Sequence, residues 1–312
     1  MERFRFLFWR PVQMLPVLFG VTLVTFILVR LLPGDPVRVL LGPRARPDMI
    51  AATRRQFGLD EALPVQYLFF LKNLIAGDLG HSIMYRAPVV EVIGERLAPT
   101  FLLVAYALVL ALLLAGALAS IAARNQGRLA DHLVRGFSTA GLGLPGFWLG
   151  ILLIMLFSVR LGWFPVSGYG ETWLGHLHHL FLPALTVAIA LAPVLTRNLR
   201  ATLLEQMTAD HAQAARSRGL TEADVFRRHV LPNALLPTVN LLGVNLGWLI
   251  GGTVVIETVF SIPGLGQLMV ASIFTRDYML VQGITLVFAL TVVAVNLTVD
   301  ILTVALDPRV GL

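Results

Sequence analysis

The stretch APTFLLVAYALVLALLLAGALASIAA, residues 98–123, decides the fold of this chain, because it is almost wholly apolar and holds no charged side chain. An α-helix needs about 20 mostly apolar residues to cross the roughly 30 Å hydrocarbon core of a membrane. This block exceeds that length, and its few polar side chains are hydroxyl groups. We therefore predict that it forms a transmembrane helix.

The rest of the chain has the same character. Of its 312 residues, 57% are hydrophobic and only 13% are charged, whereas soluble domains average about 25% charged residues. The mean hydropathy is +0.79. The sequence therefore predicts an all-α polytopic membrane protein with six transmembrane helices, at about 11–32, 98–123, 136–159, 180–199, 235–257 and 283–306.

The chain is expected to divide into four parts. The apolar block 11–32 is too long for the core of a signal peptide, so we interpret residues 1–32 as a cytoplasmic N-terminus and a retained first span. Residues 33–96 are polar and rich in proline and glycine, which predicts an outer excursion of short helices. The main membrane domain follows at 97–306, with an inner loop at 200–234, and residues 307–312 form a cytoplasmic tail.

Arginine placement predicts the orientation. If the N-terminus is cytoplasmic, the inner segments carry most of the basic residues, while the short outer loops at about 160–179 and 258–282 hold only Arg160 and Arg276. Cytoplasmic loops of membrane proteins carry such an excess. Both termini are therefore expected in the cytoplasm. The net charge of +6 is explained by orientation, and we expect no nucleic-acid partner.

Several kinds of chemistry are excluded by composition. The chain has no cysteine, which removes thiolate metal sites and a cysteine nucleophile. Lys72 is the only lysine and lies in the outer segment, and no G-x-x-x-x-G-K-[ST] phosphate loop is present. The chain therefore cannot hydrolyse ATP by such a loop. We predict a non-catalytic protein that binds no metal.

The inner loop is longer than a simple connection requires. Residues 205–219 lack proline, are rich in helix-forming residues, and end at Gly219, which can adopt a left-handed cap. We predict a helix here. Small side chains at Thr208, Ala212, Ala215 and Gly219 share one face, which suits docking into a groove on another protein; a solvated surface helix is the alternative.

Small and polar residues also mark the spans. Gly243, Gly247 and Gly251 recur every four residues, as do Gly146 and Gly150 after Pro145, which is expected to kink the third span. Close packing within the chain and an interface with a second membrane subunit, or a sliding gate, both explain these stripes. Glu257 is expected to be solvated or to face a pathway. Polar residues of the membrane-embedded blocks that are candidates for pathway or packing roles are Asn240, Asn245, Asn296 and Asp300.

A family resemblance appears in the inner loop. Gln213-Ala214-Ala215, Gly219 and His229-Val230-Leu231-Pro232 follow the spacing of the loop motif of ABC-importer permeases, Glu-Ala-Ala-x3-Gly-x9-Ile-x-Leu-Pro. Gln213 and His229 depart from that motif and are similar to the peptide-permease branch. Further segments that resemble this branch are Leu31–Pro36, Phe57–Asp60, Gly77–Gly80, Leu161–Trp163, Val255–Phe260, Ile262–Gly266, Arg276–Tyr278, Val281–Gly283 and Leu306–Val310.

The chain thus resembles the first permease subunit of a dipeptide/oligopeptide/nickel-type ABC importer. The resemblance implies a bacterial or archaeal cytoplasmic membrane, a second related permease, two ATP-binding subunits that carry ATP and Mg, and an extracytoplasmic binding protein. It implies that the inner loop couples to the ATPase. The implied docking residues are Gln213, Ala214, Ala215 and Gly219, flanked by Arg216 and Arg218.

Two other classes of membrane protein are alternatives to an ABC-importer permease. An ion-coupled secondary transporter would be expected to place several ionisable groups inside the membrane, where this chain offers mainly Asp300. An intramembrane metalloenzyme could use His176, His178 and His179, but these lie in an outer loop without an acidic partner. The cargo is left open by the sequence: the branch handles dipeptides, longer peptides, nickel, glutathione and some sugars.

Overall fold

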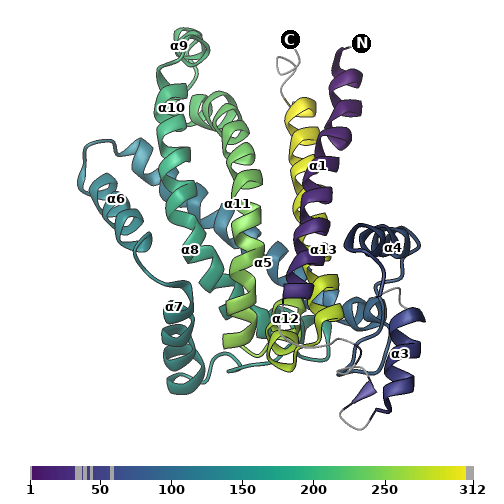
Figure 1. The fold of residues 1–312 in the computed structure, drawn as a ribbon. Helices are drawn as coiled ribbons and strands as arrows, with labels where there is room; N and C mark the ends of the chain where they lie inside the picture. The colour runs from purple at the N-terminus through teal and green to yellow at the C-terminus, as the bar shows by residue number, and fades with distance from the viewer. Residues whose placement is uncertain (1, 32–36, 38–40, 43–44, 57–59, 307–312) are drawn as a thin grey trace.

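The fold is a bundle of long helices, seen in Figure 1. The computed structural model describes residues 2–31, 37, 41–42, 45–56 and 60–306. The elements are α1 (Glu2–Leu31), α3 (Pro47–Gln56), α4 (Leu63–Ile75), α5 (Val89–Arg124), α6 (Leu129–Gly141), α7 (Gly146–Leu153), the π-helix η1 (Ile154–Arg160), α8 (Trp173–Thr208), α9 (Asp210–Ser217), α10 (Glu222–Val225), the π-helix η2 (Phe226–Val230), α11 (Leu231–Val259), α12 (Leu265–Thr275) and α13 (Tyr278–Leu306).

The centre of the bundle is the α5–α8 pair. Ala107, Ala111, Ala115 and Ala119 recur every four residues along α5, and each is at most 1% exposed. Small side chains on one face let two backbones approach closely, which is the main packing device where lipid removes the hydrophobic drive. The alanines face α8, whose leucines complete the main core cluster. This alanine stripe, and not a glycine stripe, organises the bundle.

Among the described residues, three helices are long and apolar enough to cross a membrane: Val89–Arg124, Trp173–Thr208 and Tyr278–Ile301. A fourth candidate is the pair α6 plus α7–η1, which is bent by 108°. The expected kink at Pro145 is therefore confirmed, but it divides the predicted third span at 136–159 into separate helices instead of only bending its start. The break falls at residues 142–145, where Pro145 begins α7 because proline lacks the N–H that would continue α6.

The outer excursion contains the predicted short helices, α3 and α4. Tyr67 of α4 packs edge-on against Phe26 of α1, with ring centroids 5.1 Å apart, and its hydroxyl lies 2.8 Å from the Thr22 hydroxyl. The excursion ends earlier than expected. Residues 89–96 already belong to α5, so the second long helix projects beyond the apolar block.

The two ends of the bundle differ in content. Figure 1 shows α9, the start of α1 and the end of α13 at one end, and α12 with the α7–α8 connection at the other. The arginine-rich inner loop therefore lies at the same end of the bundle as the start of α1 and the end of α13. That end is called the loop end below, and the opposite one the α12 end.

Candidate functional site

The loop end is built by a sharp break after α8. Ala209 adopts an extended conformation (φ −68°, ψ 153°), so the helix predicted over 205–219 is divided: residues up to Thr208 belong to α8, and α9 covers Asp210–Ser217. Gly219 has a φ of +81°, and its N–H donates to the Arg216 carbonyl. The predicted left-handed cap is therefore present, and it redirects the chain into α10.

The face of α9 that points inward is the alanine face. Ala212 and Ala215 are 0% and 4% exposed and pack with Leu203, Phe226 and Val230 of this same chain. The expectation that these two alanines form the free docking face is wrong for this reason. The helix presents its other side to the exterior: among the predicted docking residues, the exposed ones are Gln213, Ala214, Arg218 and Gly219.

Arg216 fastens α9 to its neighbours. Its Nε and Nη2 donate to the Glu222 carboxylate at 2.7 and 3.3 Å, and its Nη1 donates to the Met207 carbonyl at 2.9 Å. The hydrogen bond from Arg216 holds the pKa of the Glu222 carboxyl below its ordinary value. The stabilisation from this pair is complete above the ordinary carboxyl pKa and is lost as pH falls through the lowered pKa. We call these contacts of Arg216 the clamp below. The spacing of the residues in the sequence did not predict it.

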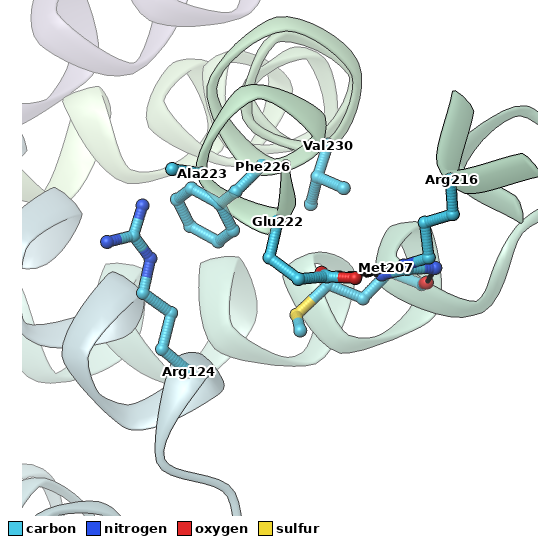
Figure 2. Close-up of a pocket in the computed structure, with 7 residues that line it drawn as sticks. All are labelled: Arg124, Met207, Arg216, Glu222, Ala223, Phe226 and Val230. Carbon is cyan, nitrogen blue, oxygen red and sulfur yellow. Dashed lines mark hydrogen bonds and ion pairs between the residues drawn. The ribbon is translucent and has the colours of Figure 1, made fainter. Parts of the chain in front are cut away.

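A cavity of about 340 Å³ opens beside the clamp, between α5, α8 and α10. Figure 2 shows Arg216 reaching toward Glu222 on one side of it, and Arg124 facing the ring of Phe226 on the other. The Arg124 guanidinium lies 4.0 Å from that ring centroid, within the range of a cation–π contact. The cavity is lined by Arg124, Met207, Arg216, Glu222, Ala223, Phe226 and Val230.

An ion pair joins α6 to α8 below the loop. Arg200 donates from Nε and Nη2 to the two carboxylate oxygens of Asp131, at 2.6 and 2.7 Å. The Asp131 side chain is 1% exposed and that of Arg200 is 20% exposed. The Gly127 N–H completes the carboxylate's partners at 3.0 Å. This geometry fixes α6 to the helix that carries α9.

Glu257 has a different role from the one predicted. It is 0% exposed, so it is neither solvated nor open to a pathway. One carboxylate oxygen accepts from the Thr100 hydroxyl at 2.7 Å, and the other accepts from the N–H groups of Gly266 and Gln267 at 2.7 and 3.1 Å. The Leu265 N–H in turn donates to Thr100 at 2.8 Å. Glu257 therefore holds the start of α12 against α5 and α11.

The Gly266→Ala variant is expected to be destabilised, because an alanine Cβ would stand 2.5 Å from the Val254 Cα. Backbone atoms must shift to make room, and overpacking of this kind costs about 1–3 kcal/mol. Thermal unfolding in detergent measures the loss. Gly252→Ala is the matched control on α11, since a Cβ there meets nothing within 4 Å. Equal melting temperatures for the two variants would contradict the close approach.

A second buried carboxylate ties the outer segment to the start of α13. Asp277 is 1% exposed and accepts from the Ser82 hydroxyl at 2.5 Å and from the Met84 N–H at 3.1 Å. It also accepts from the Leu280 N–H at 3.3 Å. These hydrogen bonds hold the segment before α5 against the α12 end of the bundle. The sequence marked 276–278 as a family-like segment without revealing this contact.

The predicted glycine stripe of α11 packs mainly within the chain. A Cβ on Gly243 would lie 3.0 Å from Val299 and one on Gly247 3.9 Å from Val292, both on α13, whereas nothing lies within 4 Å at Gly251. Gly150 similarly faces Phe260, and Gly146 faces open space. Packing within one chain therefore explains Gly243, Gly247 and Gly150.

The intramembrane polar candidates Asn245 and Asn296 lie on different helices, α11 and α13. Asn245 donates to the Leu241 carbonyl at 2.8 Å. Asn296 and Asp300 are half-buried, and Asp300 is partnered. The side chain of Asn240 lies outside the described part of the chain.

The three outer histidines each engage a backbone carbonyl. His176 Nδ1 is 2.9 Å from the Tyr169 carbonyl, His178 Nε2 is 3.0 Å from that of Trp163, and His179 Nδ1 is 2.9 Å from that of Gly175. Within the described ranges, no group of three histidine or acidic side chains is placed to hold a metal ion. His176 and His178 thus hold the α7–α8 connection to the start of α8, whereas the partner of His179 lies within α8 itself.

Known proteins share this sequence over nearly its whole length. Residues 113–312 match the family described as binding-protein-dependent transport system inner membrane component, and residues 3–104 match the N-terminal part of such components. The chain is 39% identical over 301 residues to the glutathione transport system permease protein GsiC of Escherichia coli O6:H1 (strain CFT073), covering 96% of this chain and 97% of the relative. GsiC of Escherichia coli K12 and of Salmonella typhimurium LT2 are 38% identical with the same coverage.

The fold, the apolar spans and these matches define the chain as a non-catalytic permease subunit of an ABC importer, a multi-pass protein of the inner membrane. It belongs to the family of inner-membrane permeases of binding-protein-dependent ABC transporters, in the type that includes GsiC. Membership implies ATPase and binding-protein partners.

Solved structures share the fold at low sequence identity. A structure titled as an inward-facing conformation of the MetNI methionine ABC transporter matches with a TM-score of 0.57 and 18% identity, covering 69% of this chain and 96% of that one. An amino acid ABC transporter crystallised with histidines matches with a TM-score of 0.50 and 17% identity, over 71% and 95%.

Proposed function

We propose that this chain forms one half of the translocation pathway of an importer for glutathione or short peptides, and that α9 couples it to the ATPase. Six spans with both termini in the cytoplasm, the four-part division at 1–32, 33–96, 97–306 and 307–312, and a heterodimer with a second permease belong to this proposal. ATP and Mg are held by the partner ATPases. A nickel or sugar importer of the same branch is the alternative.

The observation that carries the coupling role is the projection of α9. It is a separate short helix that stands out at the loop end, held from behind by Arg216 and the buried alanines. A rigidly supported helix can transmit a displacement, which a flexible loop cannot. Its exposed side carries Gln213 and Ala214, with the exposed Arg218 and Gly219 just after the helix, and the small side chain of Ala214 allows close approach to a partner groove.

The cargo proposal is supported by the GsiC relatives, whose identity extends along 96% of this chain. The test is uptake in proteoliposomes that contain both permeases, the ATPases and the binding protein. We expect ATP-dependent accumulation of labelled glutathione or a dipeptide, and none of labelled nickel. Uptake by this chain alone, driven by a proton gradient without ATPases, would contradict the importer mechanism; nickel or sugar uptake would replace only the cargo.

A further inference from the structure

Helix α6 has three distinct faces. Asp131, Val134, Ser138 and Gly141 are buried. Leu129, Leu133 and Phe137 recur every four residues on a second face and are 73%, 64% and 42% exposed. At 100° per residue, the third face carries the exposed residues Arg128, His132, Arg135 and Thr139.

The contacts of the buried face fix the orientation of α6 in the bundle. Asp131 is held by Arg200, and Gly141 lies so close to α8 that a Cβ there would stand 2.7 Å from the Pro193 Cγ. The only acidic side chain of α6 is therefore engaged inside the bundle. The basic face and the apolar face of α6 therefore both point away from the bundle, in a fixed orientation.

Helix α6 does not continue α7–η1 as one straight helix. The helix turns by 108° from α7–η1, and Figure 1 shows it at the edge of the bundle between the levels of α9 and α7. Residues 146–160 alone cover about 22 Å, short of the roughly 30 Å hydrocarbon core. A helix pair bent in this way is either a broken span or a re-entrant loop.

We propose that α6 lies in the cytoplasmic membrane interface and binds anionic lipid. Leu129, Leu133 and Phe137 enter the acyl region, and Arg128 and Arg135 contact headgroup phosphates. An apolar stripe beside a basic stripe is the pattern of helices that lie in the interface plane. The cytoplasmic leaflet is negatively charged, which favours arginine on this side. The proposal adds to the proposed function a lipid site that is mechanically joined, through Asp131 and Arg200, to the helix that ends at α9.

Depth measurement tests the apolar face. The chain has no cysteine, so single variants Leu133→Cys and Thr139→Cys can each carry one spin label in the assembled transporter in nanodiscs. We expect the label at 133 to be reached by oxygen and shielded from an aqueous nickel chelate, and the label at 139 to show the reverse. Aqueous access at 133, or shielding that appears only when ATPase subunits are bound, overturns the proposal by exposing that face to water or to a protein partner.

Lipid retention tests the basic face. Each arginine near an anionic surface contributes about fivefold in binding, so the Arg128→Gln, Arg135→Gln double variant is expected to bind phosphatidylglycerol about 25-fold more weakly by native mass spectrometry. The control is Arg55→Gln with Arg160→Gln, two exposed arginines of the outer segments. Equal retention by the two double variants overturns the assignment, and a failure of transport with normal retention and depth bears on the proposed function alone.

Discussion

The Ala214→Arg variant is expected to lose its ATPase subunits during purification, by about tenfold or more in affinity, and with them ATP-driven uptake. Ala214 is exposed on the outer side of α9, whereas its neighbour Ala215 is 4% exposed and packed inward. A long cation at 214 prevents close approach to a partner groove without entering the core of this chain. A tenfold change in affinity corresponds to about 1.4 kcal/mol of binding free energy, which is a small loss for a residue at the centre of an interface.

Two further variants separate docking from folding. Ala76→Arg places the same side chain at an exposed alanine of the outer segment and is expected to retain the ATPase. Ala212→Arg buries a charge at a position that is 0% exposed, so it is expected to lower the melting temperature as well. Full ATPase retention by a correctly folded Ala214→Arg protein would show that α9 is not the contact helix.

Removal of either partner of the Asp131–Arg200 pair is expected to cost about 3–5 kcal/mol in the free energy of unfolding, because an uncompensated charge is left in a buried place. Arg200→Leu is the more severe change, since Asp131 is 1% exposed while Arg200 keeps some access to water. Unfolding by SDS in mixed micelles provides the measurement.

The double variant Asp131→Leu with Arg200→Leu distinguishes a structural pair from a simple loss of packing. Replacement of both charges by apolar groups is often neutral or stabilising, so we expect most of the lost stability to return. If the two single losses merely add, the pair contributes nothing as a pair. Gly127 also loses the acceptor of its N–H, and a small residual loss is expected from that.

The sequence predicted a short capped helix in the inner loop but not which of its faces is buried. Proline-free residues followed by Gly219 indicated a short capped helix in the inner loop, and α9 with its left-handed cap is there. Helical spacing also grouped Ala212 with Ala215. Spacing alone cannot tell which body covers a small-residue face, because the choice depends on Phe226 and Val230 folding back from later in the chain.

The long-range polar contacts could not be predicted from the sequence either. Glu257 is far in sequence from Thr100, and Asp277 is far from Ser82, so no local pattern pairs them. At the end of an apolar block, a glutamate looked solvated; its actual partners are backbone N–H groups of α12, which carry no sequence signature. By contrast, the alanines of α5 recur every four residues in the sequence itself, and this repeat coincides with the buried face of the helix.

The continuity of α8 has a mechanical consequence. Its 36 residues form one helix, about 54 Å long at 1.5 Å per residue, from the histidine-ordered connection to the break before α9. It packs against α5 along most of this length, from Leu180 to Leu203. Because α5 and α8 are packed together over this length, a displacement of α9 would be passed to the α12 end by the pair moving as one body.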